Sequence, residues 1–181
     1  MIAMRLFVAV ALPDHLKEAI RNYQQEYRSE AIRFVPEDNL HLTLHFIGDT
    51  PETALPGLVE KMQSVAQRNK PYILNFQETA PGPQLHSPRL IWTRFHEHPD
   101  FARLATDLAN TLEAGPGAHG KFIPHITIAR LRKELLKPQN LSVLPDKIIP
   151  DLDMQRFALW NSQLQSPHPV YSIVQEFNLA G

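Results

Sequence analysis

The chain has 181 residues, of which 43% are hydrophobic, so it is long enough and apolar enough to bury a core. Its formal net charge of −1 argues against a protein that coats nucleic acid by bulk charge, but allows a local basic pocket for a phosphate. The absence of cysteine excludes disulfides and thiolate metal sites. No stretch approaches the roughly 20 apolar residues of a membrane helix, and the apolar run at 6–12 is short for a signal peptide. We therefore expect a cytoplasmic protein.

The first part of the chain predicts a strand, a helix and a short extended piece. Residues 5–12 are rich in Val, Leu and Phe, which indicates a buried strand. Pro13 and Asp14 suit the first turn of a helix. Apolar residues at helical spacing give this helix one packing face: Leu16, Ile20, Tyr23 and Tyr27. An extended piece at 33–36 and a turn at 37–39 then lead to the next strand.

Residues 39–49 alternate strictly between polar and apolar side chains. His41, Thr43 and His45 share one parity. Apolar side chains share the other: Leu40, Leu42, Leu44 and Phe46. A period of two predicts a strand whose apolar face lies on the core. Its opposite face should carry two imidazoles and a hydroxyl in a row.

The middle of the chain predicts further helices and strands. Residues 48–51 should end the first motif strand. Beyond them we expect a helix that begins near Pro56, a strand at 71–77, a turn region at 80–83, a strand at 90–95, a helix that begins at Pro99 and a loop at 115–120.

A second motif strand follows this loop. His125 and Thr127 repeat the His-x-Thr spacing, with isoleucines on the other face. Our working hypothesis is that the two motif strands turn their polar faces to one cleft. Arg130 has the opposite parity to His125, so it reaches this cleft only if the strand ends or bulges near Ala129, or if its long side chain curls round the edge.

The last part of the chain predicts an irregular excursion and two strands. Residues 131–150 have no clean period and contain three prolines and several basic residues, so they form either a segment over the cleft or an ordinary surface connection. Strands should follow at 154–162 and 170–177, joined by a turn at 166–169. The order of helices and strands predicts an α+β fold with two similar halves of mixed or antiparallel sheet and helices packed outside.

The paired histidines point to acid–base chemistry. The unperturbed pKa of imidazole is close to 6.5, so one ring can accept a proton near neutral pH while another donates one. Phosphodiester cleavage needs both transfers, plus donors to the non-bridging oxygens. Thr43, Thr127 and Arg130 could supply those donors without a metal ion.

Both motifs resemble a known family. Residues 39–44 and 125–130 look like the paired His-x-Thr motifs of the two-histidine (2H) phosphoesterase superfamily. Within it the chain is most similar to the LigT-like RNA 2′,3′-cyclic phosphodiesterases, also called 2′-5′ RNA ligases. Several further segments fit that branch: residues 5–10, Gly48, Pro124, 159–162 and 170–171.

The resemblance implies a single bilobal domain over residues 1–181, with pseudo-twofold symmetry and a central cleft. It implies hydrolysis of a 2′,3′-cyclic phosphate, on an RNA end or a nucleoside, to a 2′-phosphate, with no metal or cofactor. By motif position, His41 is the general acid for the 3′ leaving oxygen and His125 the base that activates water. Thr43, Thr127 and Arg130 bind the phosphate. RNA ligation would be the same reaction run backwards.

Several alternatives stay open at this point. The same fold could bind a nucleotide or RNA end without turnover, or a metal-dependent hydrolase could use His41, His45 and His125 as ligands. His45 has no counterpart in the second motif, so we interpret it as structural or cleft-lining. Phe7 and Tyr171 could stack on a base or pack in the core. We expect no membrane partner, and the near-neutral charge favours a monomer.

Overall fold

The computed structural model describes residues 3–26, 30–84, 86–112, 122–132 and 149–180. Its elements are β1 (Ala3–Ala11), α1 (Asp14–Glu26), β2 (Ile32–Phe34), a 3₁₀ turn (Glu37–Asn39), β3 (His41–Pro51), a second 3₁₀ turn (Glu52–Ala54), α2 (Leu55–Gln67), β4 (Tyr72–Leu74), β5 (Phe76–Gly82), β6 (Leu90–Phe95), α3 (Pro99–Thr111), β7 (His125–Leu131), β8 (Leu152–Met154), β9 (Arg156–Gln163) and β10 (Val170–Asn178). Tyr27, the loop at 115–120 and most of the excursion at 131–150 lie outside the described residues.

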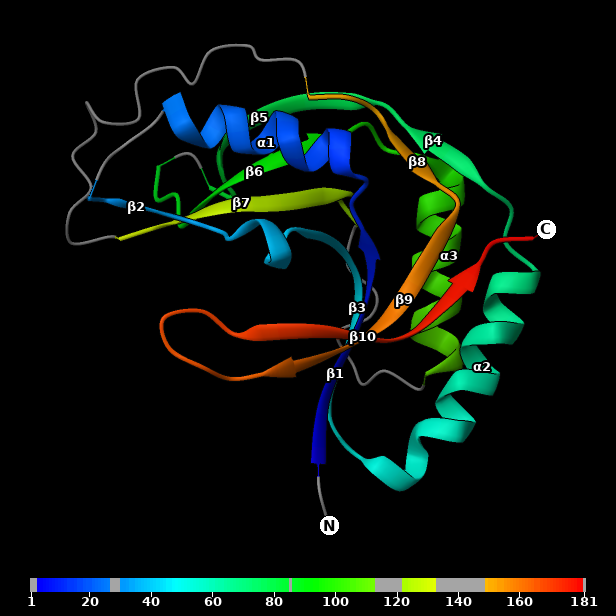
Figure 1. The fold of residues 1–181 in the computed structure, drawn as a ribbon. Helices are drawn as coiled ribbons and strands as arrows, with labels where there is room; N and C mark the ends of the chain where they lie inside the picture. Colours follow the sequence, from blue (N-terminus) through cyan, green and yellow to red (C-terminus); the bar gives the residue numbers. More distant parts are fainter. Residues whose placement is uncertain (1–2, 27–29, 85, 113–121, 133–148, 181) are drawn as a thin grey trace.

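One large sheet organises the molecule (Figure 1). Its strand order is β10-β9-β1-β3-β7-β6-β5, and the short β2 adds to β7. Every pair in it is antiparallel, and β4 and β8 form a small antiparallel sheet of their own. The predicted α+β class is therefore confirmed, and of the two kinds of sheet expected, mixed or antiparallel, the structure has the antiparallel one.

The large sheet divides into two halves at its centre. Strands β3 and β7 are joined by one ladder pair, Leu42 with Ile126, whereas the neighbouring strand pairs share much longer ladders. Both side chains of this pair are fully buried on the core face. Burial of each contributes about 1.5–3 kcal/mol, so an apolar contact fastens the halves together. The residues on either side of it, His41 and Thr43 in β3 and His125 and Thr127 in β7, point to the opposite face.

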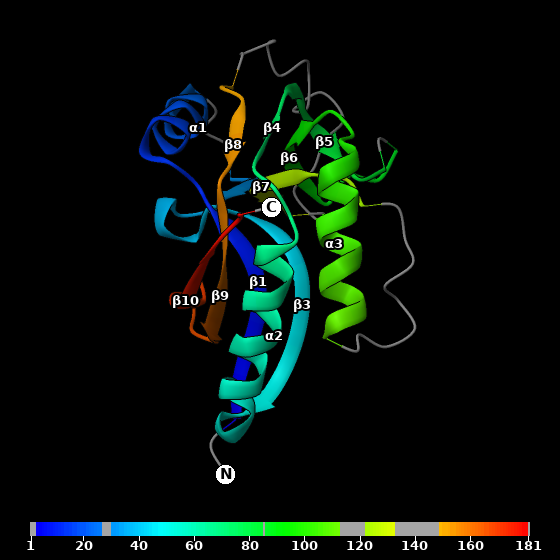
Figure 2. The same ribbon diagram turned by 90° about the vertical axis from the view of Figure 1, so that its right-hand side faces the viewer.

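The helices cover the core face. In the described chain α2 and α3 run side by side, with α2 against β10 and α3 against β3 (Figure 2). Helix α1 buries Leu16, Ile20 and Tyr23, as its spacing predicts. The Gln24 side-chain amide of α1 donates to the carbonyls of Val35 and Ile128, which ties β2 to β7. None of the described helices has the length and apolar character needed to cross a membrane.

Two predictions for the middle of the chain are wrong. Residues 80–82 are not a turn but the end of β5, which lies at the edge of the sheet. Pro81 is tolerated there because an edge strand can leave one backbone position without a donor. The single strand expected at 71–77 is two strands, β4 and β5. They separate at Asn75, where Asp151 accepts hydrogen bonds from the Asn75 side chain and the Phe76 backbone.

Strand β3 also runs further than its sequence predicts. Gly48 does not end it, and the strand continues to Pro51 by pairing with the first residues of β1. Gly48 has a φ of +91°, which a residue with a side chain rarely adopts. A glycine that reads as a strand terminator thus marks an irregular position within a strand.

Candidate active site

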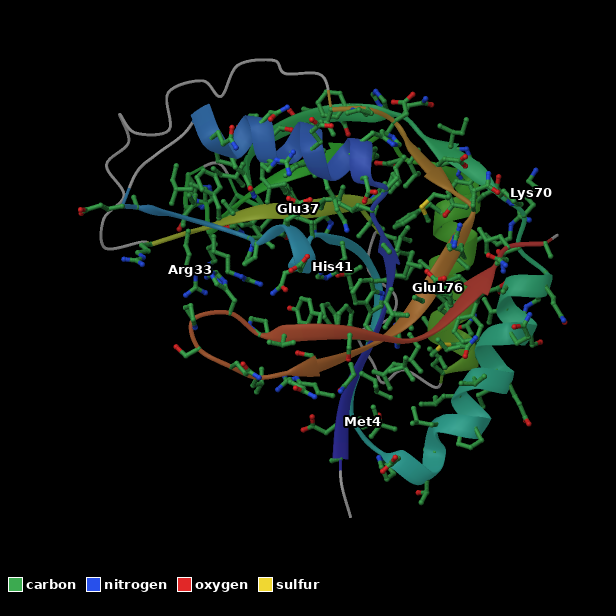
Figure 3. The ribbon with its side chains drawn as sticks, in the orientation of Figure 1. Met4, Arg33, Glu37, His41, Lys70 and Glu176 are labelled. Atoms are coloured by element: carbon green, nitrogen blue, oxygen red, sulfur yellow. The ribbon has the colours of Figure 1, made fainter. Side chains whose placement is uncertain are left out.

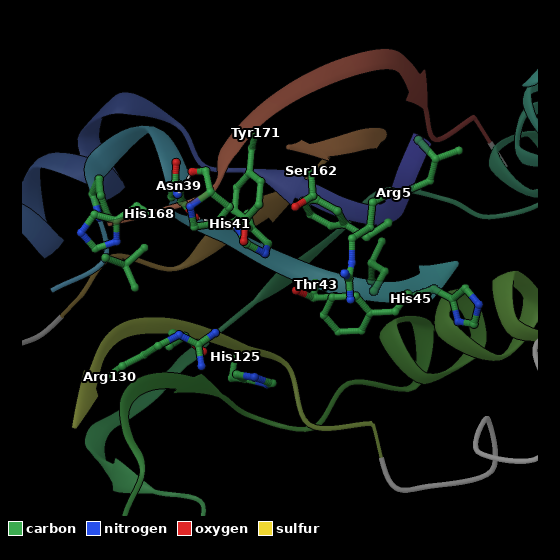
Figure 4. Close-up of a pocket in the computed structure, with 18 of the residues that line it drawn as sticks. Arg5, Asn39, His41, Thr43, His45, His125, Arg130, Ser162, His168 and Tyr171 are labelled. Atoms are coloured by element: carbon green, nitrogen blue, oxygen red, sulfur yellow. Dashed lines mark hydrogen bonds between the residues drawn. The ribbon is translucent and has the colours of Figure 1, made fainter. Parts of the chain in front are cut away.

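The polar faces of β3 and β7 form the floor of a cavity of about 870 Å³. All five side chains singled out from the motifs line it: His41, Thr43, His125, Thr127 and Arg130. Figure 4 shows His41 and Thr43 on β3 facing His125 and Arg130 on β7. Two segments far apart in sequence therefore meet in one cavity, as the repeated motif predicts.

Both histidines are held in the same way. Nδ1 of His41 lies 2.7 Å from the carbonyl oxygen of Asn39, and Nδ1 of His125 lies 2.8 Å from that of Ile123. A carbonyl oxygen only accepts, so Nδ1 carries the proton in each ring. Nε2 is then the nitrogen left to accept or donate a proton in the cavity. Two backbone bonds, each reaching two residues back, thus orient both rings and fix their tautomers.

An aromatic cluster packs around His41. The ring of Phe7 lies 5.1 Å from His41 and 5.9 Å from Trp160, measured between centroids. Tyr171 meets His41 edge-on at 5.4 Å. The indole nitrogen of Trp160 donates to the carbonyl of Ala9 at 3.1 Å, which anchors the cluster to β1. Phe7 is almost fully buried. Of the two interpretations of Phe7, packing against His41 is therefore favoured over stacking on a base.

Trp92 plays the corresponding part for His125. Its ring meets His125 at 5.0 Å with an interplanar angle of 63°, and the guanidinium of Arg94 lies 5.5 Å from the indole centroid. Arg94 is in turn paired with Glu78 of β5. The indole packs over Gly82, where a Cβ atom would lie 2.6 Å from two atoms of the ring. Gly82 is needed because the ring that positions His125 occupies the space of a side chain.

We expect Gly82→Ala to disturb this support. The new methyl group must displace Trp92, and overpacking of this kind costs about 1–3 kcal/mol. The free energy of unfolding from urea titration should fall by that amount, and turnover should fall with it because His125 loses its packing partner. Gly57→Ala is the matched control, because Gly57 lies in α2 and a Cβ added there would meet no atom within 4 Å. Alanine favours a helix by up to about 1 kcal/mol, so Gly57→Ala should be neutral or stabilising.

Burial shifts the acid–base balance of both histidines. Burial lowers the pKa of His41, against the bond to the Asn39 carbonyl, which raises it. The positive charge of His125 when it is protonated, and that of Arg130, lower the pKa of His41 further. The pKa of His125 is also lowered by burial, and its bond to the Ile123 carbonyl opposes this. In the free protein both rings therefore favour the neutral form, and a bound anion would favour protonation of either ring.

A bulge in β7 brings Arg130 to the cavity. Thr127 and Ala129 oppose consecutive residues of β6, so Ile128 is one extra residue. Ile128 and Ala129 are both buried, and Arg130 returns to the face of His125. The sequence predicts that Arg130 reaches the cavity if the strand bulges near Ala129, and β7 does bulge there.

An equivalent bulge in β3 moves two side chains away from their predicted faces. Thr43 and His45 oppose consecutive residues of β1, which makes Leu44 the extra residue. His45 is paired with Val8, a core residue, so it does not share the face of His41. Phe46 does not pack in the core but returns to the cavity, where it is 73% exposed.

His45 borders the cavity without joining its centre. It contributes to the lining, as the cleft-lining interpretation expects. Figure 4 shows its ring well apart from His41 and His125, further along β3. Partial burial lowers the pKa of His45. This third histidine is therefore placed beside the acid–base pair rather than in it.

Phe46 is a candidate site residue that strand parity misplaces. It lies five residues after His41, as Arg130 lies five after His125, and each follows a bulge. Comparing the two motifs position by position would have revealed this equivalence. An exposed aromatic ring beside a phosphate-sized site can stack on a nucleobase.

The cavity is basic although the whole chain is not. Arg5, Arg33 and Arg130 line it, and no carboxylate does so in the part of the chain that the structure describes. None of the three has a carboxylate partner among those residues. Arginines outside it are mostly paired: Arg21 with Glu37, Arg68 with Asp107, Arg94 with Glu78, Arg103 with Asp100 and Arg156 with Glu176. Unpaired arginines around a cavity favour an anionic ligand.

Positions in turns and loops predict that His98 and His168 are solvated. The structure shows that this prediction is incomplete, because both make contacts. His98 caps α3 by accepting from the Asp100 backbone at 3.2 Å and stacks on Tyr72. His168 lines the cavity. Over the described ranges, no three His, Asp or Glu side chains form a group that could hold a metal ion. The ligand set of His41, His45 and His125 therefore does not assemble.

Known proteins share this architecture. A family model for LigT-like phosphoesterases matches residues 10–92. An RNA 2′,3′-cyclic phosphodiesterase of Thermus thermophilus is 33% identical over 98% of this chain and 91% of that protein. One of Escherichia coli is 33% identical over 70% of this chain and 71% of that protein.

Solved structures extend the likeness to the whole chain. The crystal structure of TT0787 of T. thermophilus has a TM-score of 0.80 and 32% identity, over 98% of this chain and 99% of that one. E. coli LigT with NADP⁺ has a TM-score of 0.79 and 25% identity, over 99% and 100%. This chain belongs to the LigT-like phosphoesterases.

Proposed function

We propose that this protein hydrolyses 2′,3′-cyclic phosphates, on RNA ends or nucleosides, to 2′-phosphomonoesters by acid–base catalysis without a metal ion. The observation that carries the proposal is the pair of imidazoles whose Nδ1 atoms are fixed by backbone carbonyls, so that both Nε2 atoms serve one basic cavity. Relatives that carry the name RNA 2′,3′-cyclic phosphodiesterase support the choice of substrate. E. coli LigT has also been solved with 3′-AMP, a nucleotide of related shape.

In this mechanism His125 accepts a proton from water, which attacks phosphorus in line with the 3′ oxygen. The P–O3′ bond breaks, and His41 donates a proton from Nε2 to the departing oxygen. Thr43 and Thr127 donate hydrogen bonds to the non-bridging oxygens, and Arg130 balances their growing charge. The bound phosphate anion favours the protonated form of His41 that the step requires.

The test is hydrolysis of a short RNA ending in a 2′,3′-cyclic phosphate, with chelator present. We expect turnover to a 2′-phosphate. Binding without turnover would contradict the proposal and leave a binding module, and turnover lost on chelation would point to a metal-dependent hydrolase. Both motifs lie in one chain, so we propose that residues 1–181 act as a single domain and that a monomer is sufficient.

The lowered histidine pKa values predict a particular pH dependence. The base must be neutral, so kcat/KM rises with pH through its pKa; the acid must be protonated, so kcat/KM falls above its pKa. Because both pKa values lie below the ordinary value of 6.5 in the free protein, kcat/KM should peak below that pH. The bound anion raises both pKa values, so kcat should peak at higher pH than kcat/KM. Coinciding optima above neutrality would contradict the assignment.

A further inference from the structure

Arg33 and Arg130 lie directly opposite each other in the β2–β7 pair. Directly opposed side chains on one face have Cβ atoms about 4.5–5.5 Å apart, and like charges at such positions destabilise a sheet. Both arginines line the cavity, and within the described chain neither has a carboxylate partner. No carboxylate of the described residues offsets this repulsion, and a bound anion would relieve it.

The local sequence directs Arg33 to the cavity. Its neighbours in β2, Ile32 and Phe34, pack against the core, so alternation turns Arg33 to the opposite face. Figure 3 shows its side chain directed from β2 toward β10. His168 also lines the cavity, and Figure 4 shows it on the side opposite Arg130. The carbonyl of its neighbour Pro169 accepts a hydrogen bond from the Asn39 side chain at 2.8 Å. The segment that carries His168 is thus fixed to the segment that leads into the strand of His41.

The proposed mechanism assigns no role to Arg33. A cyclic phosphate carries one negative charge, and two histidines, two threonines and Arg130 already surround it. An RNA end carries a further phosphate, on the 5′ side of its last nucleoside. We infer that Arg33, together with His168, which lines the same cavity, forms a second phosphate subsite that selects nucleotide chains over lone nucleoside cyclic phosphates. This inference rests on the proposed function.

The experiment compares substrates that differ only in the second phosphate. The first is a nucleoside 2′,3′-cyclic phosphate, the second a dinucleotide with the same end, and the third that dinucleotide with an uncharged methylphosphonate linkage. A nucleoside with both a 5′-phosphate and a 2′,3′-cyclic phosphate distinguishes a terminal phosphate from an internal one. For each, kcat/KM is measured with the natural protein, Arg33→Gln and Arg89→Gln, whose exposed arginine lies outside the cavity.

For the natural protein, we expect kcat/KM to be about tenfold higher with the charged dinucleotide than with the nucleoside cyclic phosphate or the methylphosphonate dinucleotide. A tenfold ratio corresponds to about 1.4 kcal/mol. Arg33→Gln should lose this preference, and Arg89→Gln should keep it. An equal loss on all substrates in Arg33→Gln, or a preference lost in Arg5→Gln instead, would overturn the inference. Failure of the natural protein to open any of the cyclic phosphates would overturn the proposed function itself.

Thermal unfolding gives a second readout that does not depend on turnover. Without anions, Arg33→Gln should melt at a temperature equal to or above that of the natural protein, because the repulsion with Arg130 is removed. Added inorganic phosphate should raise the melting temperature of the natural protein more than that of Arg33→Gln. A variant that melts lower in both conditions would show that Arg33 supports the fold rather than a ligand.

Discussion

Replacing either His41 or His125 by alanine should slow the opening of a 2′,3′-cyclic phosphate by about 10²–10⁴, the usual contribution of a positioned acid or base. Backbone carbonyls and aromatic neighbours orient both imidazole rings. Removing either ring therefore removes a proton donor or acceptor that is already positioned for the reaction. Single-turnover rates measured with saturating protein separate this effect from weaker binding. An effect below tenfold in either variant would remove that histidine from the mechanism.

The two roles can be separated by the leaving group. With sulfur in place of the 3′ oxygen, departure needs little help from an acid, because a thiolate is a far weaker base than an alkoxide. The sulfur substrate should restore much of the rate in His41→Ala and little in His125→Ala. The opposite pattern would exchange the acid and the base. His45→Ala is the internal control: this second histidine of β3 pairs with Val8 and lies apart from the acid–base pair, so its effect should be much smaller.

Arg130→Lys should lower kcat by about 10²–10³, similar to the loss of one donor to a developing oxyanion. Lysine keeps the charge but cannot form the planar, two-pronged contact of a guanidinium. The bulge in β7 positions the side chain of Arg130, so the compact ammonium group of a lysine at this position should not substitute for the guanidinium. Stopped assays of product formation at saturating substrate measure the effect.

Arg89→Lys provides the matched control, since it makes the same exchange outside the cavity. It should leave kcat close to that of the natural protein. If Arg130→Lys behaved in the same way, charge alone would account for the contribution of Arg130. Arg130 would then act in the mechanism only by balancing charge, and the bidentate contact expected here would be ruled out.

Alternation in the two motifs was sufficient to predict the centre of this site. A period of two places His41 and Thr43 on one face of β3, and His125 and Thr127 on one face of β7, and the structure brings these faces together. The prediction needed only local geometry and the repeat. The expectation of a mixed or antiparallel sheet likewise followed from the order of helices and strands along the chain.

The alternation of residues predicted the wrong face for side chains that follow a bulge. One extra residue reverses every following side chain, which is why His45 and Phe46 exchange faces relative to the prediction. The bulge depends on how a neighbouring strand pairs, and a strand's own sequence does not contain this. Arg33 was missed for a related reason. It becomes a cavity residue only through its position opposite Arg130.

The bulges in β3 and β7 bear on the orientation that a bound nucleotide would adopt in the cavity. Each motif strand returns its sixth motif residue to the cavity, but one half supplies a planar apolar ring and the other a cation. Two identical halves could not distinguish the ends of a bound nucleotide. Phe46 and Arg130 make the two sides of the cavity different, so under the proposed function the base would lie toward Phe46 and the phosphate toward Arg130. Together with the different aromatic neighbours of His41 and His125, this sixth position makes the surroundings of two otherwise equivalent histidines unequal.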